Sequence, residues 1–424
     1  MSTDRSNRAV PRGSTRRPAL MLALATAGFA VNFWAWALLS PLGPRFKELL
    51  NLSAAQQALL VAVPVIVGSL GRIPVGALTD RFGGRVMFPL ISAAAIVPVL
   101  FIGVAGQSSL AALLVGGFFL GIGGTVFAVG VPFVSAWFPP ERRGLAVGVF
   151  GMGMGGTAIS ALTTVRLVRT GGSATPFLLT AAILALYAVV AWCVLRDAPG
   201  RTVPAQSSVA RLAAAVRLPI TWQACVLYAV AFGGYVAFSV YLPVYLQSAY
   251  GLEQADAANR MAGFVILAVA MRPIGGWLSD RIGPIPVLVA VFAVVALCAA
   301  VQAFTPPLMM LGTVAFLTMA GALGAGSGAT FALVAAVAPA DKVGSVTGLV
   351  GAAGGLGGFV PPLVMGFVYG LFGSYGLGLA LLAGVSVLTL VLTLTAVRAT
   401  ARQALGRAGA VQAGTVTSAG DSDS

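Results

Sequence analysis

The feature that most constrains this chain is a series of twelve apolar stretches, each about 20 residues long, that recur along almost its whole length. A helix of that length crosses the hydrocarbon core of a bilayer. In lipid the backbone must satisfy its own hydrogen bonds, and these stretches are too uniformly apolar to alternate as barrel strands do. Hydrophobic residues make up 58% of the chain and charged residues 8%. We therefore predict an all-α polytopic membrane protein with twelve transmembrane helices.

The net charge of +14 is explained by membrane topology and gives no reason to expect nucleic acid as a partner. With a cytoplasmic N-terminus, eighteen Lys or Arg residues lie in the loops and tails of one side and five in those of the other. Positively charged loops stay on the cytoplasmic side of a membrane. We expect a multi-pass protein of the plasma membrane, the cell inner membrane, with both termini in the cytoplasm and the lipid bilayer around it.

The sequence repeats once, at an offset of 200 residues. GRIPVGALTDRFGGR starts at Gly71, and its counterpart MRPIGGWLSDRIGP starts at Met271. Two parallel repeats of six helices indicate two bundles related by a pseudo-two-fold axis along the membrane normal, with a cavity between them. The predicted parts are a cytoplasmic tail over 1–18, a bundle over 19–195, a cytoplasmic linker over 196–219, a second bundle over 220–397 and a cytoplasmic tail over 398–424.

Arg72 and Arg272 are the two basic residues inside the predicted helices. Each lies eight residues before an aspartate at the end of its helix, hence about 12 Å from that end and near the middle of the bilayer. The chain has no histidine, and all of its 11 Asp and Glu residues lie outside the predicted helices. An arginine cannot lose its charge and is costly in hydrocarbon, so another group must compensate it.

We interpret the two arginines as a pair of clamps for a small planar oxyanion. A guanidinium offers parallel N–H donors, and the exclusion of water strengthens the hydrogen bonds that they make. The alternative is a structural role, in which each guanidinium reaches the lipid headgroups or bonds backbone carbonyls of a neighbouring helix.

Two pairs of motifs carry a resemblance to a known family. GALTDRFGGR, from Gly76, and GWLSDRIG, from Gly276, resemble the loop signature of the major facilitator superfamily. GIGGTVFAVGVPFVSAWFPPERRG, from Gly121, and VTGLVGAAGGLGGFVPPL, from Val346, resemble the nitrate/nitrite porter family within it. The resemblance covers all twelve helices. It implies the major facilitator fold, alternating access, and transport of nitrate, nitrite or both in nitrate assimilation. We also expect no cofactor and function as a monomer.

The resemblance also assigns binding residues. In that family, two arginines that match Arg72 and Arg272 bind the nitrate or nitrite, and aromatic rings lie against its flat faces. Phe127 matches the aromatic residue of the fourth helix, and Tyr228 and Phe232 match those of the seventh. The alternative is that these rings only pack the bundle.

The chain also departs from the family pattern at two positions. The family often has asparagines where this chain has Val126 and Met154. The loss of these amides leaves the superfamily assignment intact, but it keeps another small anion, such as cyanate, open as the substrate.

Charged residues at the cytoplasmic helix ends form a second candidate cluster. Its members are Asp80, Arg81, Arg85, Glu141, Arg142, Asp280, Arg281, Asp341 and Lys342. We predict a network that latches the two halves when the cavity faces outward, because both repeats contain it in the same register. The alternative is a set of solvated salt bridges, each worth at most about 1 kcal/mol.

Glycine-rich runs lie in the fifth and eleventh predicted helices. Small residues spaced by three or four positions let helices approach closely and slide. The glycines concerned are Gly148, Gly151, Gly155, Gly348, Gly351 and Gly355. A phosphate-binding loop is excluded because the runs lack the flanking strand and the lysine that such loops use.

The charges also bear on mechanism. In an empty cavity the two cations repel each other and oppose closure, and a bound monoanion relieves that repulsion, which favours exchange of anions by an antiporter. Proton symport usually relies on an acid or histidine in the pathway, and the predicted helices contain neither. Proton-coupled nitrate uptake remains the first alternative. A drug-efflux carrier is a further one, although it would be expected to have a larger, more apolar cavity and often an intramembrane acid.

An enzyme is not expected. Without histidine, and with every carboxylate in loops or tails, the chain cannot assemble a nucleophile, a base and a set of metal ligands. We therefore predict no catalytic residues and no metal site.

Overall fold

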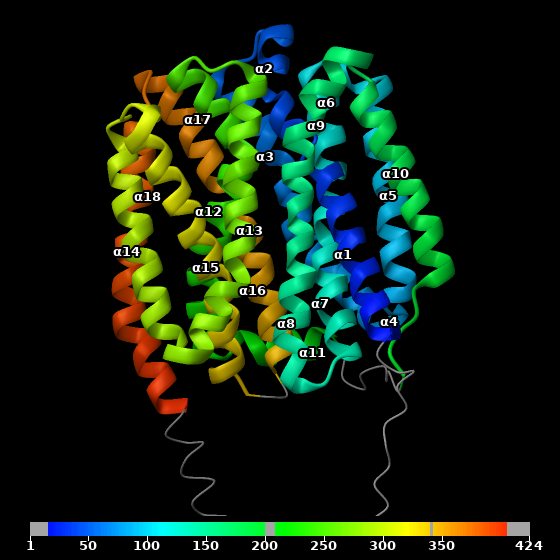
Figure 1. Cartoon of the computed structure of the whole chain (residues 1–424), viewed down its shortest axis with the longest axis vertical. Coiled ribbons are helices and arrows are strands. Elements are labelled where there is room, and N and C mark those ends of the chain that lie inside the picture. The colour runs from blue at the N-terminus through cyan, green and yellow to red at the C-terminus, as the bar shows by residue number, and fades with distance from the viewer. Residues whose placement is uncertain (1–15, 200–207, 340–341, 405–424) are drawn as a thin grey trace, which may run out of the picture.

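A computed structural model describes residues 16–199, 208–339 and 342–404, and every regular element in these ranges is helical. Twelve helical segments are long and apolar enough to cross a membrane. They stand side by side as one bundle with both described chain ends at the same face, which we call the terminal face (Figure 1). The twelve predicted helices and the all-α fold class are confirmed.

The first bundle consists of ten helices and two short helical turns that interrupt its spans. These are α1 (Arg16–Trp36), α2 (Leu39–Leu50), α3 (Ala54–Leu70), α4 (Arg72–Phe82), α5 (Gly84–Val104), α6 (Leu110–Leu120), η2 (Gly121–Thr125), α7 (Val126–Trp137), α8 (Pro140–Gly151), η3 (Met152–Gly155), α9 (Gly156–Gly171) and α10 (Thr175–Val194). A further turn, η1 (Gly106–Ser108), connects α5 to α6.

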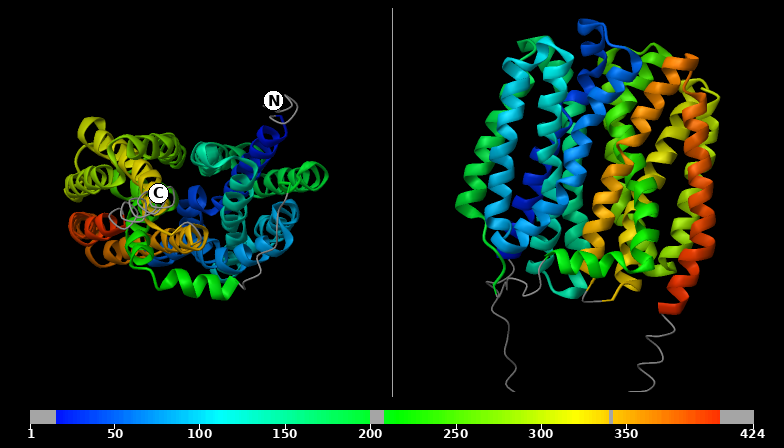
Figure 2. Two further views of the ribbon diagram at one scale, coloured as in Figure 1. Left: turned by 90° about the horizontal axis from the view of Figure 1, so that it is seen from below. Right: turned by 180° about the vertical axis from the view of Figure 1, so that it is seen from behind.

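The second bundle has longer, less interrupted helices. These are α12 (Pro219–Tyr250), α13 (Gln254–Ile282), α14 (Pro284–Ala303), η4 (Leu308–Gly312), α15 (Thr313–Val337), α16 (Val343–Gly357), α17 (Val360–Phe372), α18 (Gly376–Leu392) and η5 (Thr393–Val397). The two bundles stand next to each other, and α11 (Ser208–Val216) crosses beneath them at the terminal face (Figure 2).

The boundaries differ from the predicted ones in several places. The first span continues through α2 to Leu50, the last runs on to Ala404, and the linker predicted over 196–219 contains α11. The longer helices place Glu48, Asp80, Asp256 and Asp280 inside helical segments, although near their ends. The physical reason is that a helix continues past the hydrocarbon core wherever its polar residues can remain in the interface.

Glycine allows the first bundle to pack its backbones closely beside Arg72. A methyl group added at Gly121 would lie 2.4 Å from the carbonyl oxygen of Pro64, and one at Gly124 would lie 2.9 Å from the Cα of Gly68. Real Cβ atoms do not approach so closely, so η2 can lie against α3 only because these residues have no side chain. The carbonyl of Gly124 is thereby brought to Arg72.

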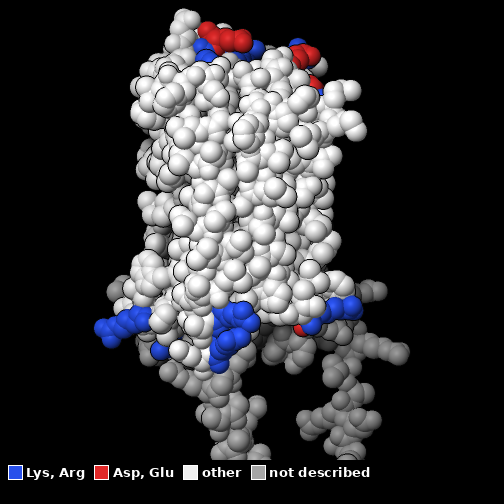
Figure 3. Space-filling model, turned by 90° about the vertical axis from the view of Figure 1, so that its left-hand side faces the viewer, with Lys and Arg blue, Asp and Glu red and all other residues white. Residues whose placement is uncertain are grey.

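The outer surface separates charge from hydrocarbon. Figure 3 shows a broad uncharged band on one face of the molecule, with Lys and Arg below it and both acidic and basic residues above it. Exposed apolar side chains such as Leu186, Val189 and Trp192 follow one ridge of α10. This surface suits a protein whose solvent is lipid, and the chain is a multi-pass membrane protein.

The two bundles are closed against each other at the face opposite the terminal face. Ser40 Oγ donates to the carbonyl oxygen of Val240 over 2.7 Å, and Gln254 donates to the carbonyl oxygen of Pro41 over 2.8 Å. Arg169 of the first bundle forms an ion pair with Glu253 of the second. In this conformation the space between the bundles is shut on that side.

The packing of α17 against α3 on the closed side can be tested by substitution. A Cβ added at Gly366 of α17 would lie 2.4 Å from the Cβ of Ala58 on α3, whereas one at Gly370 would meet nothing within 4 Å. We expect Gly366→Val to separate the two helices and to raise several-fold the rate at which a membrane-impermeant thiol reagent modifies Gln57→Cys. Gln57 lines a cavity of about 500 Å³ on this side.

The matched control is Gly370→Val on the same helix, with the three native cysteines replaced in every variant. Equal modification rates in the Gly366→Val and Gly370→Val proteins would contradict the view that α3 and α17 form the closure.

Candidate functional site

The two arginines of the repeat lie at the boundary between the bundles. Arg72 is the first residue of α4 and is 6% exposed, while Arg272 lies within α13 and is half-buried. Arg72 Nη1 donates to the carbonyl oxygen of Gly351 over 2.6 Å. Arg272 Nη1 donates to the sulfur of Met154. Each arginine therefore reaches from its own bundle into the other.

A third side chain connects the two arginines. The ring centre of Phe232 lies 5.7 Å from the guanidinium carbon of Arg72 and 5.4 Å from that of Arg272. The sum of these distances is an upper limit to the separation of the two guanidinium carbons. An aromatic face attracts a cation, so the ring partly stabilises both charges. The two arginines thus share one site.

The other predicted aromatic residues complete this site. The ring centre of Phe127 lies 5.1 Å from the guanidinium carbon of Arg72. Tyr228 accepts a hydrogen bond from Arg272 Nη2 over 3.0 Å and stacks on Phe232, with ring centres 4.8 Å apart. The structure brings together all five residues that the sequence singled out for binding.

Neither arginine has an acidic partner in the described part of the chain. The three ion pairs found there are Arg169–Glu253, Arg211–Asp80 and Arg260–Asp256, and all of them lie toward helix ends. The acceptors at the site are two carbonyl oxygens, a phenolic oxygen and a thioether sulfur, all uncharged, and a thioether accepts hydrogen bonds weakly. The positive charge is only partly compensated, as an anion site requires.

Arg72 also shows the structural role weighed as the alternative. Besides Gly351, it donates from Nε to the carbonyl oxygen of Gly124 over 3.4 Å. Backbone carbonyls therefore hold this guanidinium in the present conformation. Because they are neutral acceptors, an anion would form stronger hydrogen bonds with the same donors.

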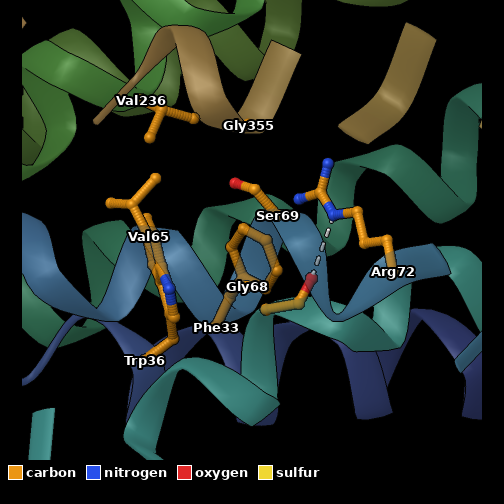
Figure 4. A pocket seen from close by; sticks show the side chains of 9 residues that line it. Phe33, Trp36, Val65, Gly68, Ser69, Arg72, Val236 and Gly355 are labelled. Carbon is orange, nitrogen blue, oxygen red and sulfur yellow. Dashed lines mark hydrogen bonds between the residues drawn. The ribbon is translucent and has the colours of Figure 1, made fainter. Parts of the chain in front are cut away.

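A small enclosed cavity adjoins Arg72 (Figure 4). Its volume of about 10 Å³ is room for about one water molecule. Its lining consists of Phe33, Trp36, Val65, Gly68, Ser69, Arg72, Gly124, Val236 and Gly355. Elements of both bundles contribute, so the cavity lies in the boundary between them.

Sequence reasoning missed Ser69, Phe33 and Trp36 of this lining. Ser69 precedes Arg72 by three residues, which places the two on one face of a helical segment. The spacing of Ser69 and Arg72 in the sequence could therefore have identified Ser69 as a residue of the site. The two aromatic residues of α1 gave no comparable signal, because an aromatic residue in an apolar helix is most often a packing residue.

The predicted gating cluster is described only in part. The side chains of Glu141 and Arg142, and the whole of Asp341, lie outside the described residues. Asp80 forms an ion pair with Arg211 of α11, a partner that the sequence did not suggest. Among the described residues, neither Asp280 nor Lys342 takes part in an ion pair.

The arginines of this cluster make other contacts. The guanidinium of Arg81 lies over the ring of Phe82, at 5.3 Å, and that of Arg281 lies over the ring of Trp277, at 4.2 Å. The backbone N–H of Arg85 donates to Asp197 over 3.1 Å. The latch therefore stays a prediction, and the linker helix is its clearest described component.

The six glycines predicted to allow close helix packing differ in how near the neighbouring helix lies in this conformation. Cβ atoms added at Gly151, Gly155 or Gly348 would meet nothing within 4 Å, and one at Gly148 would first meet Pro273 at 3.9 Å. The close packing expected at these four glycines is thus not seen here. A Cβ at Gly351 would lie 3.5 Å from Phe127, and one at Gly355 would lie 2.2 Å from the hydroxyl of Ser69. Among the six predicted glycines, Gly355 alone approaches a neighbouring helix closely in this conformation.

Within the described ranges, no group of three or more His, Cys, Asp or Glu side chains could hold a metal ion. The site consists of guanidiniums, aromatic rings and hydroxyls, and its chemistry is that of binding.

The chain is similar to known membrane carriers. The sequence-family model of the Major Facilitator Superfamily matches residues 25–362 and 257–419 of this chain. The probable nitrate/nitrite transporter NarK2 of Mycobacterium tuberculosis is 51% identical over 374 residues, covering 88% of this chain and 95% of that protein. The nitrite extrusion protein of Bacillus subtilis is 35% identical, covering 89% of this chain and 94% of that protein.

The fold is also found in solved structures. A bacterial homologue of the human lysosomal transporter Spinster, in an inward-facing and occupied conformation, superposes with a TM-score of 0.72 at 20% identity. The match covers 92% of this chain and 98% of that one. At this identity the likeness concerns the fold alone.

The ion pair between Asp80 and Arg211 generates a prediction about stability. Both side chains are roughly one-third exposed, so the pair should contribute no more than about 1 kcal/mol. We expect Asp80→Asn and Arg211→Gln each to lower the melting temperature slightly, and the double variant to lower it by less than the sum of the two.

The control is Arg217→Gln, one residue beyond α11, combined with Asp80→Asn. Additive effects in the Asp80→Asn, Arg211→Gln double variant, like those expected for this control, would show that the pair does not couple the linker helix to α4.

Proposed function

The chain belongs to the major facilitator superfamily, and we propose that it carries nitrate, nitrite or both across the membrane by alternating access. It is a transporter and not an enzyme. The observation that carries the proposal is the convergence of two arginines, without a carboxylate partner among the described residues, on the ring of Phe232 between the bundles. The names of the relatives agree with this substrate class.

The proposed binding residues act by complementary chemistry. Arg72 and Arg272 supply charge and forked N–H donors, which match the oxygens of a small planar oxyanion. Phe127 and Phe232 lie near the guanidiniums and offer flat apolar faces, and the hydroxyl of Tyr228 supplies a further polar group. An anion entering the site takes the place of weak neutral acceptors, above all the sulfur of Met154.

The contacts of the two arginines also suggest how binding is linked to movement. Arg72 bonds to Gly351 of α16 and Arg272 to Met154 of η3, so both contacts join one bundle to the other. An anion between the guanidiniums replaces both contacts at once and holds the bundles together through its own charge. Glycines with open space beside them, such as Gly151 and Gly348, leave room for the helices to shift.

We favour exchange of anions over proton coupling. The described aspartates and glutamates lie near helix ends or in loops, and the chain has no histidine, so the middle of the pathway lacks the usual proton carriers. Two cations facing each other oppose closure of the empty site, which makes return without an anion slow. Proton-coupled nitrate uptake is the alternative, and the exchange experiment below separates the two.

The cellular setting follows from charge. Most of the Lys and Arg residues in loops and tails lie on the terminal side, which supports a cytoplasmic location for both termini in the plasma membrane. The proposed binding residues come from both bundles of one chain, so we propose that the monomer functions as a carrier.

The arginines provide the first test of this proposal. Arg72→Lys and Arg272→Lys keep the charge but remove the planar fork, and we expect each to raise the half-saturating nitrate concentration at least tenfold. The double variant Arg72→Ala, Arg272→Ala should abolish uptake while the protein still elutes as a single species. Arg260→Lys, at a half-exposed ion pair, is the control. Normal uptake by the double variant would exclude the arginine site.

Coupling is tested in proteoliposomes. Labelled nitrate is supplied outside, with and without internal nitrite and with and without a proton gradient. We expect uptake that requires an internal anion and does not respond to the gradient. Uptake into anion-free vesicles driven by protons would retain the binding site but contradict exchange, and absence of nitrate and nitrite transport under all conditions would contradict the proposed substrate.

A further inference from the structure

Ser69 is exceptional among the buried serines and threonines of the described residues. It is 1% exposed, and its hydroxyl makes no hydrogen bond with any described residue. Every other buried serine or threonine there has a hydrogen-bond partner for its hydroxyl, usually a carbonyl oxygen three or four residues earlier, as in Thr79 and Ser279. A serine hydroxyl in a helix usually bonds a backbone carbonyl of its own helix, so one that faces a cavity without such a bond calls for an explanation.

The position of Ser69 supplies one. The side chain lines the same small cavity as Arg72, and Figure 4 shows both polar groups directed into the space below Gly355 of α16. Ser69 and Arg72 are separated by three residues, which places them on one face of the segment. Gly355 faces the hydroxyl so closely that its missing Cβ would lie 2.2 Å from Oγ. A glycine at this point leaves the hydroxyl free.

The repeat shows that this hydroxyl belongs to one bundle only. At the offset of 200 residues, the counterpart of Ser69 is Val269, which has no polar group. The phenol of Tyr228 beside Arg272 has Gly28 as its own counterpart. The first bundle therefore provides a hydroxyl from α3 and the second provides one from α12, so the pseudo-symmetric arginines lie in an asymmetric set of donors.

We propose that Ser69 donates a hydrogen bond to the third oxygen of a trigonal oxyanion held by Arg72 and Arg272. This inference rests on the proposed function and adds to it a preference for nitrate over nitrite. Nitrate has three oxygens in a plane, and two guanidiniums on opposite sides take up two of those directions. A hydroxyl donor fits the third direction and has no equivalent oxygen to bind in nitrite. Ser69 thus makes the site favour the three-oxygen anion.

In this conformation the cavity beside Ser69 is too small for nitrate. About 10 Å³ holds one water molecule but not a four-atom anion, so α16 must move away from Ser69 when the anion binds. Gly355 is the residue that retreats, and the anion oxygen takes the space that it leaves. In the loaded protein the hydroxyl then donates to the anion oxygen.

The test compares Ser69→Ala with the unmodified chain, measuring the half-saturating concentrations of nitrate and nitrite in exchange-loaded proteoliposomes. Loss of one hydrogen bond to an anion corresponds to an increase of about tenfold. We expect that increase for nitrate and less than about threefold for nitrite. Ser279→Ala is the matched control, because its hydroxyl is buried but bonded within its own helix.

An equal increase for the two anions, or none for either, would overturn the assignment of Ser69. If Ser69→Ala is too unstable to assay, Ser69→Cys keeps the side-chain size with a weaker donor and should show the same order of effects. Failure of the unmodified chain to transport either anion would instead reject the proposed function.

Discussion

The structure depends on one constraint, which is that two permanent positive charges are held between helices without a carboxylate to balance them. Arg72 is buried, and its donors are occupied by backbone carbonyls, while Arg272 is occupied by a phenol and a sulfur. Such acceptors hold a guanidinium in place without neutralising it. The remaining attraction for negative charge is what a site for a small anion needs, and the burial of Arg72 strengthens it by lowering the dielectric around the charge.

The surroundings of the two arginines differ between the bundles although their sequences repeat. In the first bundle, Gly121 and Gly124 let η2 lie directly against α3, which brings a carbonyl to Arg72 and buries it. In the second, α13 is continuous, and Arg272 stays half-buried with a phenol as partner. Close glycine packing occurs in the second bundle as well, since a Cβ at Gly324 would lie 2.0 Å from the carbonyl oxygen of Ala268. The bundles differ instead in the helix that carries the arginine, which is interrupted at Gly71 before Arg72 and unbroken around Arg272.

The contacts between bundles fall into two groups with different physical character. At the face opposite the termini they are hydrogen bonds to carbonyls, an exposed ion pair and the close approach of Gly366 to Ala58. At the level of the arginines they are charge-assisted contacts with neutral acceptors, which an anion can replace. A carrier that opens alternately to the two sides of the membrane needs both groups of contacts. The first group closes one face, and the second responds to the substrate.

The sequence by itself determined the membrane class, the twelve helices, the repeat and five side chains of the site, because apolar length, a 200-residue offset and two isolated arginines are local or periodic signals. Only the tertiary structure decided that Asp80 pairs with Arg211, that Met154 faces Arg272, and that Ser69 lacks a partner. Each of these contacts depends on which residue of another helix lies opposite. The spacing of residues along one sequence does not show which residues of different helices lie close together. The helix ends were also missed, since a helix extends into the interface as far as its neighbours allow.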